Sequence, residues 1–306
     1  MQVINSLKDL PSSNSYALTI GNFDGVHLGH QKLLKCLLEE SQKKKRELVV
    51  ITFVPHPLTI LRNLKGFLIN SYEERCELLE ALGVKYVVEL NFTRDFSTLS
   101  PEKFMDDFVL QNDRVEALYL GYDFAFGANK KGNHEFVKDH CKDRSIEVHI
   151  QEKFIEGEKT YSSTLVRNQL NTGKTLEAIN SLGRPFYLKG RVIKGAGRGH
   201  QIGFPTANIP LDFERIAPEV GVYATRCTFR KGSYISITNV GYNPTFKDEK
   251  ELNIETNVFD FDGDLYGEEI KVEFFQKIRD EKKFSSVNEL IDQIKKDVSF
   301  RRTLND

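Results

Sequence analysis

Residues 21–30 read Gly21-Asn-Phe-Asp-Gly-Val-His-Leu-Gly-His30 and join two segments of different periodicity. The run at 16–20 before them is of β type, and the leucines after them recur at helical spacing. Two glycines therefore turn the chain from strand to helix, and His27 and His30 lie three apart on one face of the helix start. The first amides of a helix have no partner inside it and carry partial positive charge, so this corner is suited to phosphate.

The two histidines have other interpretations. A strand-turn-helix corner with two exposed histidines has the same sequence, because short motifs also occur in unrelated proteins. Histidine is also a metal ligand, but no cysteine or third ligand lies at a useful spacing. The rest of the chain must therefore support the phosphate site.

The composition argues against several classes of protein. At 306 residues the chain is long enough for two domains, each with its own core. A charged content of 28% and a net charge of −1 argue against nucleic-acid and membrane-surface binders, which are usually basic. No window has the apolar length of a membrane span, and the N-terminus lacks the features of a signal peptide. The four scattered cysteines are typical of reduced thiols in a cytoplasmic protein.

The first half alternates strand and helix patterns. Ser71 opens a capping box before a helix that ends at Gly83, and Ser100-Pro101 starts another helix. The alternation predicts a parallel sheet with helices on both faces, and such sheets bind ligands at the carboxyl ends of their strands. The predicted strands are 16–20, 47–53, 86–90, 117–120 and 146–150.

Polar and aromatic residues follow two of these strands. His56 is held in an extended loop by two prolines, where it is either a ligand or an exposed histidine of a rigid loop. Asp123 stands beside Phe124 and Phe126, which suit either a flat ring such as flavin or adenine, or simply the core. Both segments would lie at the ligand edge of the sheet.

A second anion site is predicted at 161–167. Hydroxyls at Ser162, Ser163 and Thr164 precede Arg167, which lies about one helical turn later on the same side. An arginine can grip a polyphosphate through two donors. Helix capping is the alternative role of the hydroxyls.

The second half has a different period. After residue 185, short β-type runs at 187–193, 222–229, 234–238, 252–259 and 270–275 replace helical spacing, with hairpin turns between some of them. This pattern predicts a small antiparallel barrel. Ser285 caps a final amphipathic helix, which we expect to pack on the barrel. We place the domain boundary between residues 182 and 183, giving domains 1–182 and 183–306.

A glycine-rich segment begins the second domain's ligand site. Residues 195–208 read Gly195-Ala-Gly-Arg-Gly-His-Gln-Ile-Gly-Phe-Pro-Thr-Ala-Asn208, and their glycines let backbone amides approach phosphate. Thr206 and Asn208 offer neutral oxygens on one side of an extended segment. With ATP phosphates, these oxygens make a Mg²⁺ site. A glycine-rich β-loop without a ligand is the alternative.

These motifs resemble those of bacterial bifunctional riboflavin kinase/FAD synthetases. The first half has the family's Gly-Asn-Phe-Asp-Gly-Val-His-Leu-Gly-His, Thr-Phe-x-Pro-His-Pro, Gly-x-Asp-Phe-x-Phe-Gly and Ser-Ser-Thr-x-x-Arg segments. The second half has Pro-Thr-Ala-Asn, then Asn239-Val-Gly-Tyr-Asn-Pro-Thr-Phe246 and Ile278-Arg-Asp-Glu-Lys-Lys-Phe284. The resemblance implies a Rossmann-like α/β nucleotidyltransferase domain and an all-β six-stranded riboflavin-kinase barrel with a C-terminal helix.

By this resemblance, the first domain transfers AMP from ATP to FMN, making FAD and pyrophosphate. His27 and His30 would stabilise the α-phosphate, and Ser163 and Arg167 would hold the β- and γ-phosphates. The ATP and FMN site would comprise Gly21, Asn22, Phe23, Asp24, His27, His30, His56, Asp123, Phe126, Ser163, Thr164 and Arg167.

By the same resemblance, the second domain phosphorylates riboflavin to FMN with ATP and Mg²⁺. Glu255 would be the base that takes the proton of the riboflavin 5′-hydroxyl, although its position alone favours a solvated strand face. His200 departs from the basic Arg or Lys that is common in the family. The ATP and flavin site would comprise Gly195, Gly197, Gly199, Gly203, Pro205, Thr206, Asn208 and Arg279, with Mg²⁺ on Thr206 and Asn208.

Two other functions are consistent with parts of the sequence. The first domain would adenylylate another phosphate substrate, such as a pantetheine phosphate, or one domain would be a flavin-binding regulatory module without turnover. We expect riboflavin, FMN, FAD and ATP as ligands, no nucleic-acid or membrane partner, and a cytoplasmic location. A homo-oligomer is left open.

Overall fold

The computed structural model describes residues 1–152, 155–156, 159–195, 197, 199, 202–243 and 251–304. The chain divides into two compact units, Met1–Ser163 and Thr164–Asp306. This division falls inside a helix, α6 (Ser163–Asn171). The boundary between residues 182 and 183 stays a prediction.

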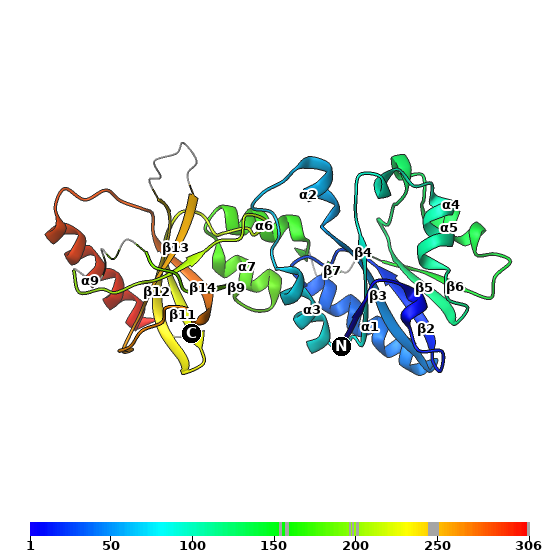
Figure 1. Ribbon diagram of the computed structural model, residues 1–306, viewed down its shortest axis with the longest axis horizontal. Coiled ribbons are helices and arrows are strands. Elements are labelled where there is room, and N and C mark those ends of the chain that lie inside the picture. The colour runs from blue at the N-terminus through cyan, green and yellow to red at the C-terminus, as the bar shows by residue number, and fades with distance from the viewer. Residues whose placement is uncertain are drawn as a thin grey trace. The chain divides into compact units, whose positions relative to one another are not determined.

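The first unit is built on a six-stranded sheet whose strands all pair parallel (Figure 1). The strand order is β1-β4-β3-β2-β5-β6. Chain order therefore reverses beside β2, and the segments after β2 and β5 meet at one edge, which is where such sheets bind ligands. The strands are β1 (Gln2–Ile4), β2 (Ser15–Ile20), β3 (Arg46–Val54), β4 (Tyr86–Asn91), β5 (Val115–Gly121) and β6 (Glu147–Gln151).

Helices cover both faces of this sheet. Leu34 and Leu37 of α1 pack with Leu79 of α3 on one face, whereas Phe104 and Val137 belong to the core on the other face. The predicted α/β architecture is confirmed. The helices are α1 (Leu28–Lys43), α2 (Pro57–Arg62), α3 (Tyr72–Ala81), α4 (Pro101–Phe104), which continues as a π-helix (Met105–Val109), and α5 (His134–His140). Shorter elements are 3₁₀ turns at Leu7–Asp9, Phe96–Thr98 and Ala128–Lys130, and the hairpin of β7 (Ile155–Glu156) and β8 (Lys159–Thr160).

Local sequence signals account for the helix ends. Ser71 and Glu74 form the predicted capping box at the start of α3, and Gly83 follows its end with φ +99°. Strand β1 was not predicted, because its three largely exposed residues pair only with β4 and are too few to show a period.

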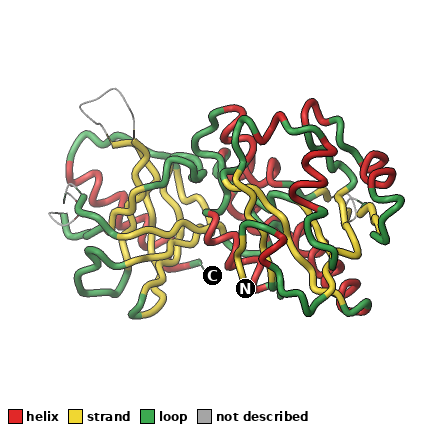
Figure 2. The backbone as a smooth tube through the Cα atoms, turned by 45° about the vertical axis from the view of Figure 1, so that its right-hand side comes forward, coloured by secondary structure: helices red, strands yellow, loops and turns green. Residues whose placement is uncertain are grey.

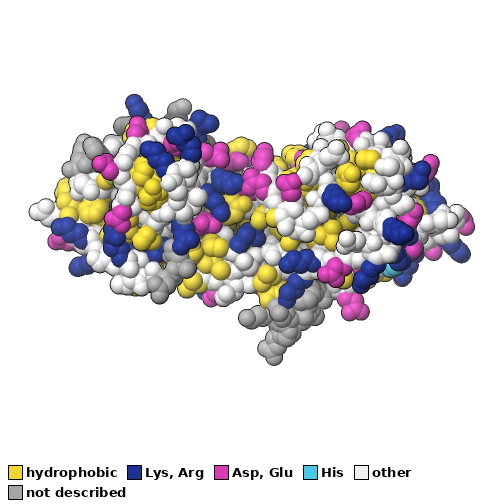
Figure 3. All heavy atoms as spheres, turned by 90° about the horizontal axis from the view of Figure 1, so that it is seen from below, with side chains coloured by type: hydrophobic (Ala, Val, Ile, Leu, Met, Phe, Trp, Pro, Cys, Tyr) yellow, Lys and Arg dark blue, Asp and Glu magenta, His cyan; other side chains and the backbone are white. Residues whose placement is uncertain are grey.

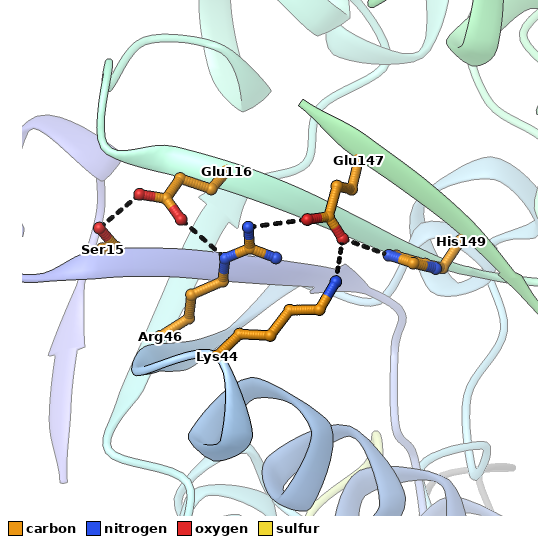
Figure 4. Close-up of polar contacts among 6 residues, drawn as sticks. All are labelled: Ser15, Lys44, Arg46, Glu116, Glu147 and His149. Atoms are coloured by element: carbon orange, nitrogen blue, oxygen red, sulfur yellow. Dashed lines mark hydrogen bonds and ion pairs between the residues drawn. The ribbon is translucent and has the colours of Figure 1, made fainter. Parts of the chain in front are cut away.

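Charged side chains tie together the amino ends of three parallel strands (Figure 4). Arg46 donates from Nε to Glu116 (2.7 Å) and from Nη2 to Glu147 (2.9 Å). Glu147 also accepts from Lys44 and bonds His149 Nε2 at 2.9 Å. These bonds hold the pKa of Glu147 well below its usual range, mainly through Arg46. The cluster therefore stabilises the end of the sheet opposite to the carboxyl ends of the strands, where ligands are expected to bind.

The second unit is an antiparallel barrel with strand order β10-β13-β12-β11-β14-β9. An isolated bridge between Ile193 and Asn208 links the two outer strands, so the barrel is nearly closed. Figure 2 shows these strands in yellow, curving around their common core. The predicted barrel is confirmed. Its strands are β9 (Phe186–Arg191), β10 (Ala207–Pro210), β11 (Gly221–Phe229), β12 (Gly232–Asn243), β13 (Glu251–Val258) and β14 (Glu269–Arg279), and α7 (Thr175–Leu182) packs against β14 and β9.

The C-terminal helix α9 (Val287–Thr303) is held mainly by polar contacts. Arg301 is fully buried and donates to the carbonyls of Thr225 and Ser236. Val287, the first residue of this helix, is 59% exposed. The prediction that Ser285 caps this helix is wrong, because Ser286 accepts from the Glu289 amide while Ser285 donates to the Glu289 carboxylate.

The surface has mixed charge. On the face shown in Figure 3, lysine and arginine side chains are interspersed with aspartate and glutamate. This distribution agrees with the net charge of −1.

Candidate functional site

The loop after β2 is held in an unusual backbone conformation. Phe23 and Val26 have φ of 49° and 37°, in the left-handed region that side chains rarely adopt. Gly25 has φ 83°, and a Cβ there would lie 2.9 Å from Ile69 Cδ1, so only glycine fits. Such strain persists only where the surroundings determine the backbone, and it is concentrated at functional sites.

Residues 69–75 fix this loop from outside. The carboxylate of Asp24 accepts from the Ile69 amide at 3.0 Å, and Arg75 donates to the carbonyl of Asn22 at 3.2 Å. Arg75 is buried and pairs with Glu89 at 3.1 Å. Asp24, predicted to bind ATP or FMN, therefore holds the loop in this structure. Arg75 was missed, because nothing in the sequence connects it to the loop.

His27 and His30 are not exposed, so the interpretation of residues 21–30 as a corner with two exposed histidines is wrong. His27 is the N-cap of α1 rather than a residue of its first turn, and its Nδ1 accepts from the His30 amide at 3.3 Å. The two rings stack with centroids 3.7 Å apart. Burial, and secondarily His27, hold the pKa of His30 well below its usual range, so its ring is neutral.

Buried polar atoms of this loop point to a ligand. Within the described residues, Asn22 Oδ1 and His30 Nδ1 are buried without a hydrogen-bond partner. Native proteins rarely leave such atoms unpaired, because the loss of hydration is costly. Both were predicted site residues, and they flank the strained turn at the ligand edge.

His56 is a buried cap, not the exposed histidine that was the alternative to a ligand. Its side chain accepts from the Leu58 amide at 3.1 Å at the start of α2, and its ring lies against Phe67. Its own amide donates to Tyr72 Oη at 3.0 Å. A binding role for His56 stays a prediction.

The segment after β5 is partly core. Phe126 lies 5.0 Å from Phe104 and from Phe124 by ring centroids, and both Phe124 and Phe126 pack against the buried cluster. Asp123 beside them is exposed. The core interpretation therefore accounts for Phe126, and contact of Asp123 or Phe126 with a ligand stays a prediction.

The start of α6 returns to the strained loop. Ser163 Oγ donates to the carbonyl of Asp24 at 2.8 Å, so the structure brings Ser163 to this loop. Thr164 and Arg167 follow in α6 and belong to the second compact unit. Their contact with phosphate stays a prediction.

The second unit places its predicted polar residues on one strand face. Asn208 of β10 lies directly opposite Glu255 of β13, and Asn239 of β12 lies opposite Glu255 on the other side. Paired residues of antiparallel strands project to the same face, so these three side chains lie together. The prediction of a solvated strand face does not describe Glu255, which is half-buried among them.

A residue that the sequence did not single out joins this group. Asn253 Nδ2 donates to Glu255 Oε1 at 2.7 Å and to Asn208 Oδ1 at 3.2 Å. The period-two alternation of a strand was the available signal, because it puts residues 253 and 255 on one face.

The glycine-rich segment packs closely over Asn208. A Cβ on Gly195 would lie 2.3 Å from Asn208 Nδ2, and one on Gly199 would lie 2.3 Å from the Phe204 carbonyl. Gly197 and Gly203 have φ of 69° and 83°. The carbonyl of Pro205, just before Thr206, accepts from Asn257 at 2.7 Å. His200 lies outside the described residues, as do 244–246 of the second-half motif.

Arg279 is engaged by the C-terminal helix. Its Nε and Nη2 each lie 2.9 Å from Asp297 Oδ2, and Asp297 is buried. This two-pronged ion pair anchors α9 to β14. The predicted place of Arg279 beside flavin is not apparent from these contacts and stays a prediction.

Comparisons with known proteins match the two halves of the chain to two family models. Residues 10–165 match the FAD synthetase family model, and residues 182–304 match the riboflavin kinase model. The bifunctional riboflavin kinase/FMN adenylyltransferase of Bacillus subtilis is 37% identical over 92% of this chain and 89% of its own. The chain belongs to the bifunctional riboflavin kinase/FMN adenylyltransferase family. The Escherichia coli K12 member is 36% identical over 96% of this chain and 94% of its own.

A solved structure has the same fold as this family member. It is described as a macrolide-efflux protein from Streptococcus pneumoniae, is 32% identical, covers 99% of both chains and has a TM-score of 0.87. In the part of this chain that the structure describes, no helix is long and apolar enough to cross a membrane. Residues 21–30, which we call the histidine loop, lie in the range that matches the FAD synthetase model. Asn208 and Glu255 lie in the range that matches the riboflavin kinase model.

Proposed function

We propose that this family member phosphorylates riboflavin to FMN in its barrel and adenylylates FMN to FAD in its parallel-sheet unit. The observation that carries the proposal is the pairing of Asn208 with Glu255, which unites the predicted cation ligand and base on one face. The strained histidine loop supports the second reaction. Family membership supports both, because the relatives' name gives both activities in one chain.

In adenylyl transfer, a phosphate oxygen of FMN attacks the α-phosphorus of ATP, and pyrophosphate leaves. His27 Nδ1 already accepts a hydrogen bond, so Nε2 is the ring nitrogen that would donate to the phosphate. The α1 N-terminus adds partial positive charge. These groups would stabilise the charge that develops on the α-phosphate, with no covalent intermediate.

In the kinase reaction, the 5′-oxygen of riboflavin attacks the γ-phosphorus of ATP, and ADP leaves. The carboxylate of Glu255 would accept the hydroxyl proton as the new bond forms. The amides of Gly195, Gly197 and Gly199 would approach the phosphates, because a glycine has no side chain in the way. Thr206 and Asn208 would hold Mg²⁺ through neutral oxygens, and the ion offsets phosphate charge.

We also place this protein in the cytoplasm. Its four cysteines are all free, which suits a reducing compartment.

Chromatography of flavins tests the proposal. Purified protein is incubated with riboflavin, ATP and Mg²⁺, and samples are taken over time. We expect FMN first and FAD after it. FMN alone would contradict the assignment of the first unit and favour another phosphate substrate there. Riboflavin that binds without conversion would contradict the kinase and favour a regulatory module.

A further inference from the structure

We propose that Asn253 is a positioning residue of the kinase reaction, which holds the carboxylate of Glu255 beside the amide oxygen of Asn208. The inference rests on the proposed function, because it assigns Asn253 a task only if Glu255 is the base. Asn253 does not touch the reacting atoms in this account. It acts through the two residues that do.

The geometry places one amide group between two oxygens. Asn253 lies two residues before Glu255 on β13, so the two side chains share a face. Its Nδ2 is 2.7 Å from Glu255 Oε1 and 3.2 Å from Asn208 Oδ1. A side-chain amide has two N–H donors, and these contacts use both. A single side chain therefore links the strand that carries the base with the strand that carries the predicted cation ligand.

The bond to Asn208 also sets the orientation of that side chain. With Oδ1 accepting from Asn253, the Nδ2 of Asn208 faces the carbonyl of Thr206 at 3.4 Å. The oxygen of Asn208 is thereby directed to the side where Glu255 lies. If Asn208 rotated by half a turn, it would present its N–H donors, which cannot ligate a cation.

The bond to Glu255 sets the orientation of its carboxylate. With Oε1 accepting from Asn253, the carboxylate is held on the strand face that also carries Asn208. The neighbouring strand brings Gly241 opposite Asn253, and Glu281 Oε1 comes 2.9 Å from where a Cβ on Gly241 would lie. Glu281 is thus a second carboxylate near this face, and Asn239 and Asn208 contribute neutral amides. A neutral donor at 253 supports Glu255 without adding charge.

The strand provides a matched control. Asn257 lies two residues after Glu255, on the same face, and its Nδ2 also makes a bond of 2.7 Å. Its acceptor is the carbonyl of Pro205 and not a carboxylate. Asn253→Leu and Asn257→Leu therefore each remove one side-chain amide from β13, but only the first removes a donor from Glu255.

The test is a comparison of kcat with KM for FMN formation from riboflavin, measured on the full chain at one pH. For Asn253→Leu we expect kcat to fall at least about tenfold while KM for riboflavin stays within about twofold, because a misplaced base slows the chemical step and not the binding of the flavin. Asn253→Asp, which has the same shape but no N–H donor, should lose as much. For Asn257→Leu we expect kcat to stay within about threefold of wild type. Thermal unfolding followed by circular dichroism reports that the barrel of each variant is folded.

The outcomes separate the inference from the function on which it rests. If wild type makes FMN and Glu255→Gln does not, but both Asn253 variants keep the wild-type kcat, the positioning role is wrong. An equal loss of kcat in Asn257→Leu would also overturn it, since the effect would then be general to the strand. If Glu255→Gln retains full kinase activity, the assignment of the base itself is wrong.

Discussion

Replacing Arg75 by methionine tests how the histidine loop is held. Methionine fills much of the space of the arginine stem but removes its charge and its donors. The change removes the ion-pair partner of Glu89 and the donor to the Asn22 carbonyl. The side chain of Arg75 is 4% exposed and that of Glu89 is 20% exposed, so this ion pair is largely shielded from water.

The structure sets the expected size of the effect. Removing one partner of a fully buried pair costs about 3–5 kcal/mol, and the remaining exposure of Glu89 reduces this to about 2–3 kcal/mol. For a unit of this size, each kcal/mol lowers Tm by about 2–4 °C, so we expect a drop of about 4–12 °C. FMN adenylylation should fall about tenfold, because a hydrogen bond from a charged group is worth about 1.5–3 kcal/mol.

Thermal unfolding followed by circular dichroism, with both enzymatic rates at 25 °C, is the assay. Lys85→Met is the matched control, because Lys85 pairs with Glu47 at 2.7 Å while its side chain is 64% exposed. That change should cost less than about 0.5 kcal/mol. The reasoning is refuted if Arg75→Met lowers Tm no more than the control, or if riboflavin phosphorylation falls as much as FMN adenylylation.

Three further predictions concern single side chains. The pKa of His30 is lowered in the folded state, so stability should fall as pH drops below about 6.5, and His30→Gln should flatten this slope in Tm measured from pH 7.5 to 5.5. The pKa of Glu147 is also lowered, so its bonds stabilise the fold above the unfolded pKa of about 4.3 and are lost as pH falls. Glu147→Gln should lower the free energy of unfolding by about 1 kcal/mol at pH 7, because the side chain is 38% exposed. In urea titrations, the difference in free energy of unfolding between variant and wild type should narrow toward pH 3. Gly195→Ala would push Asn208 aside, so FMN formation should fall at least about tenfold while FAD formation from FMN is unchanged. If the variant and wild type formed FMN at equal rates, the close packing of Gly195 on Asn208 would be contradicted.

Much of the fold was predictable because it depends on local signals. Strand-helix alternation and the Ser71 capping box identified the parallel sheet, and the change to short β-type runs identified the barrel. Strand β1 was not predicted, because it is stabilised by pairing with β4 and its own sequence shows no β-type alternation. The first residue of α9 was misplaced by one, because two adjacent serines share the bonds of one glutamate.

The candidate sites were predictable in their motifs but not in their partners. The sequence singled out Asp24 and Arg279 as ligand contacts, and the structure shows their charges bound to the Ile69 amide and to Asp297. Conversely, the contact of Arg75 with Asn22 and that of Asn253 with Asn208 depend on tertiary pairing, which periodicity does not reveal. Residue type and spacing thus predicted the candidate sites, whereas strand register decided which side chains meet.

The central claim is that the two reactions take place in separate units, and a pair of variants tests it most directly. Glu255→Gln and His30→Ala are each assayed for FMN formation from riboflavin and for FAD formation from added FMN. We predict that Glu255→Gln loses only the first reaction and that His30→Ala loses only the second. A folded variant of either kind that loses both reactions equally would contradict the claim.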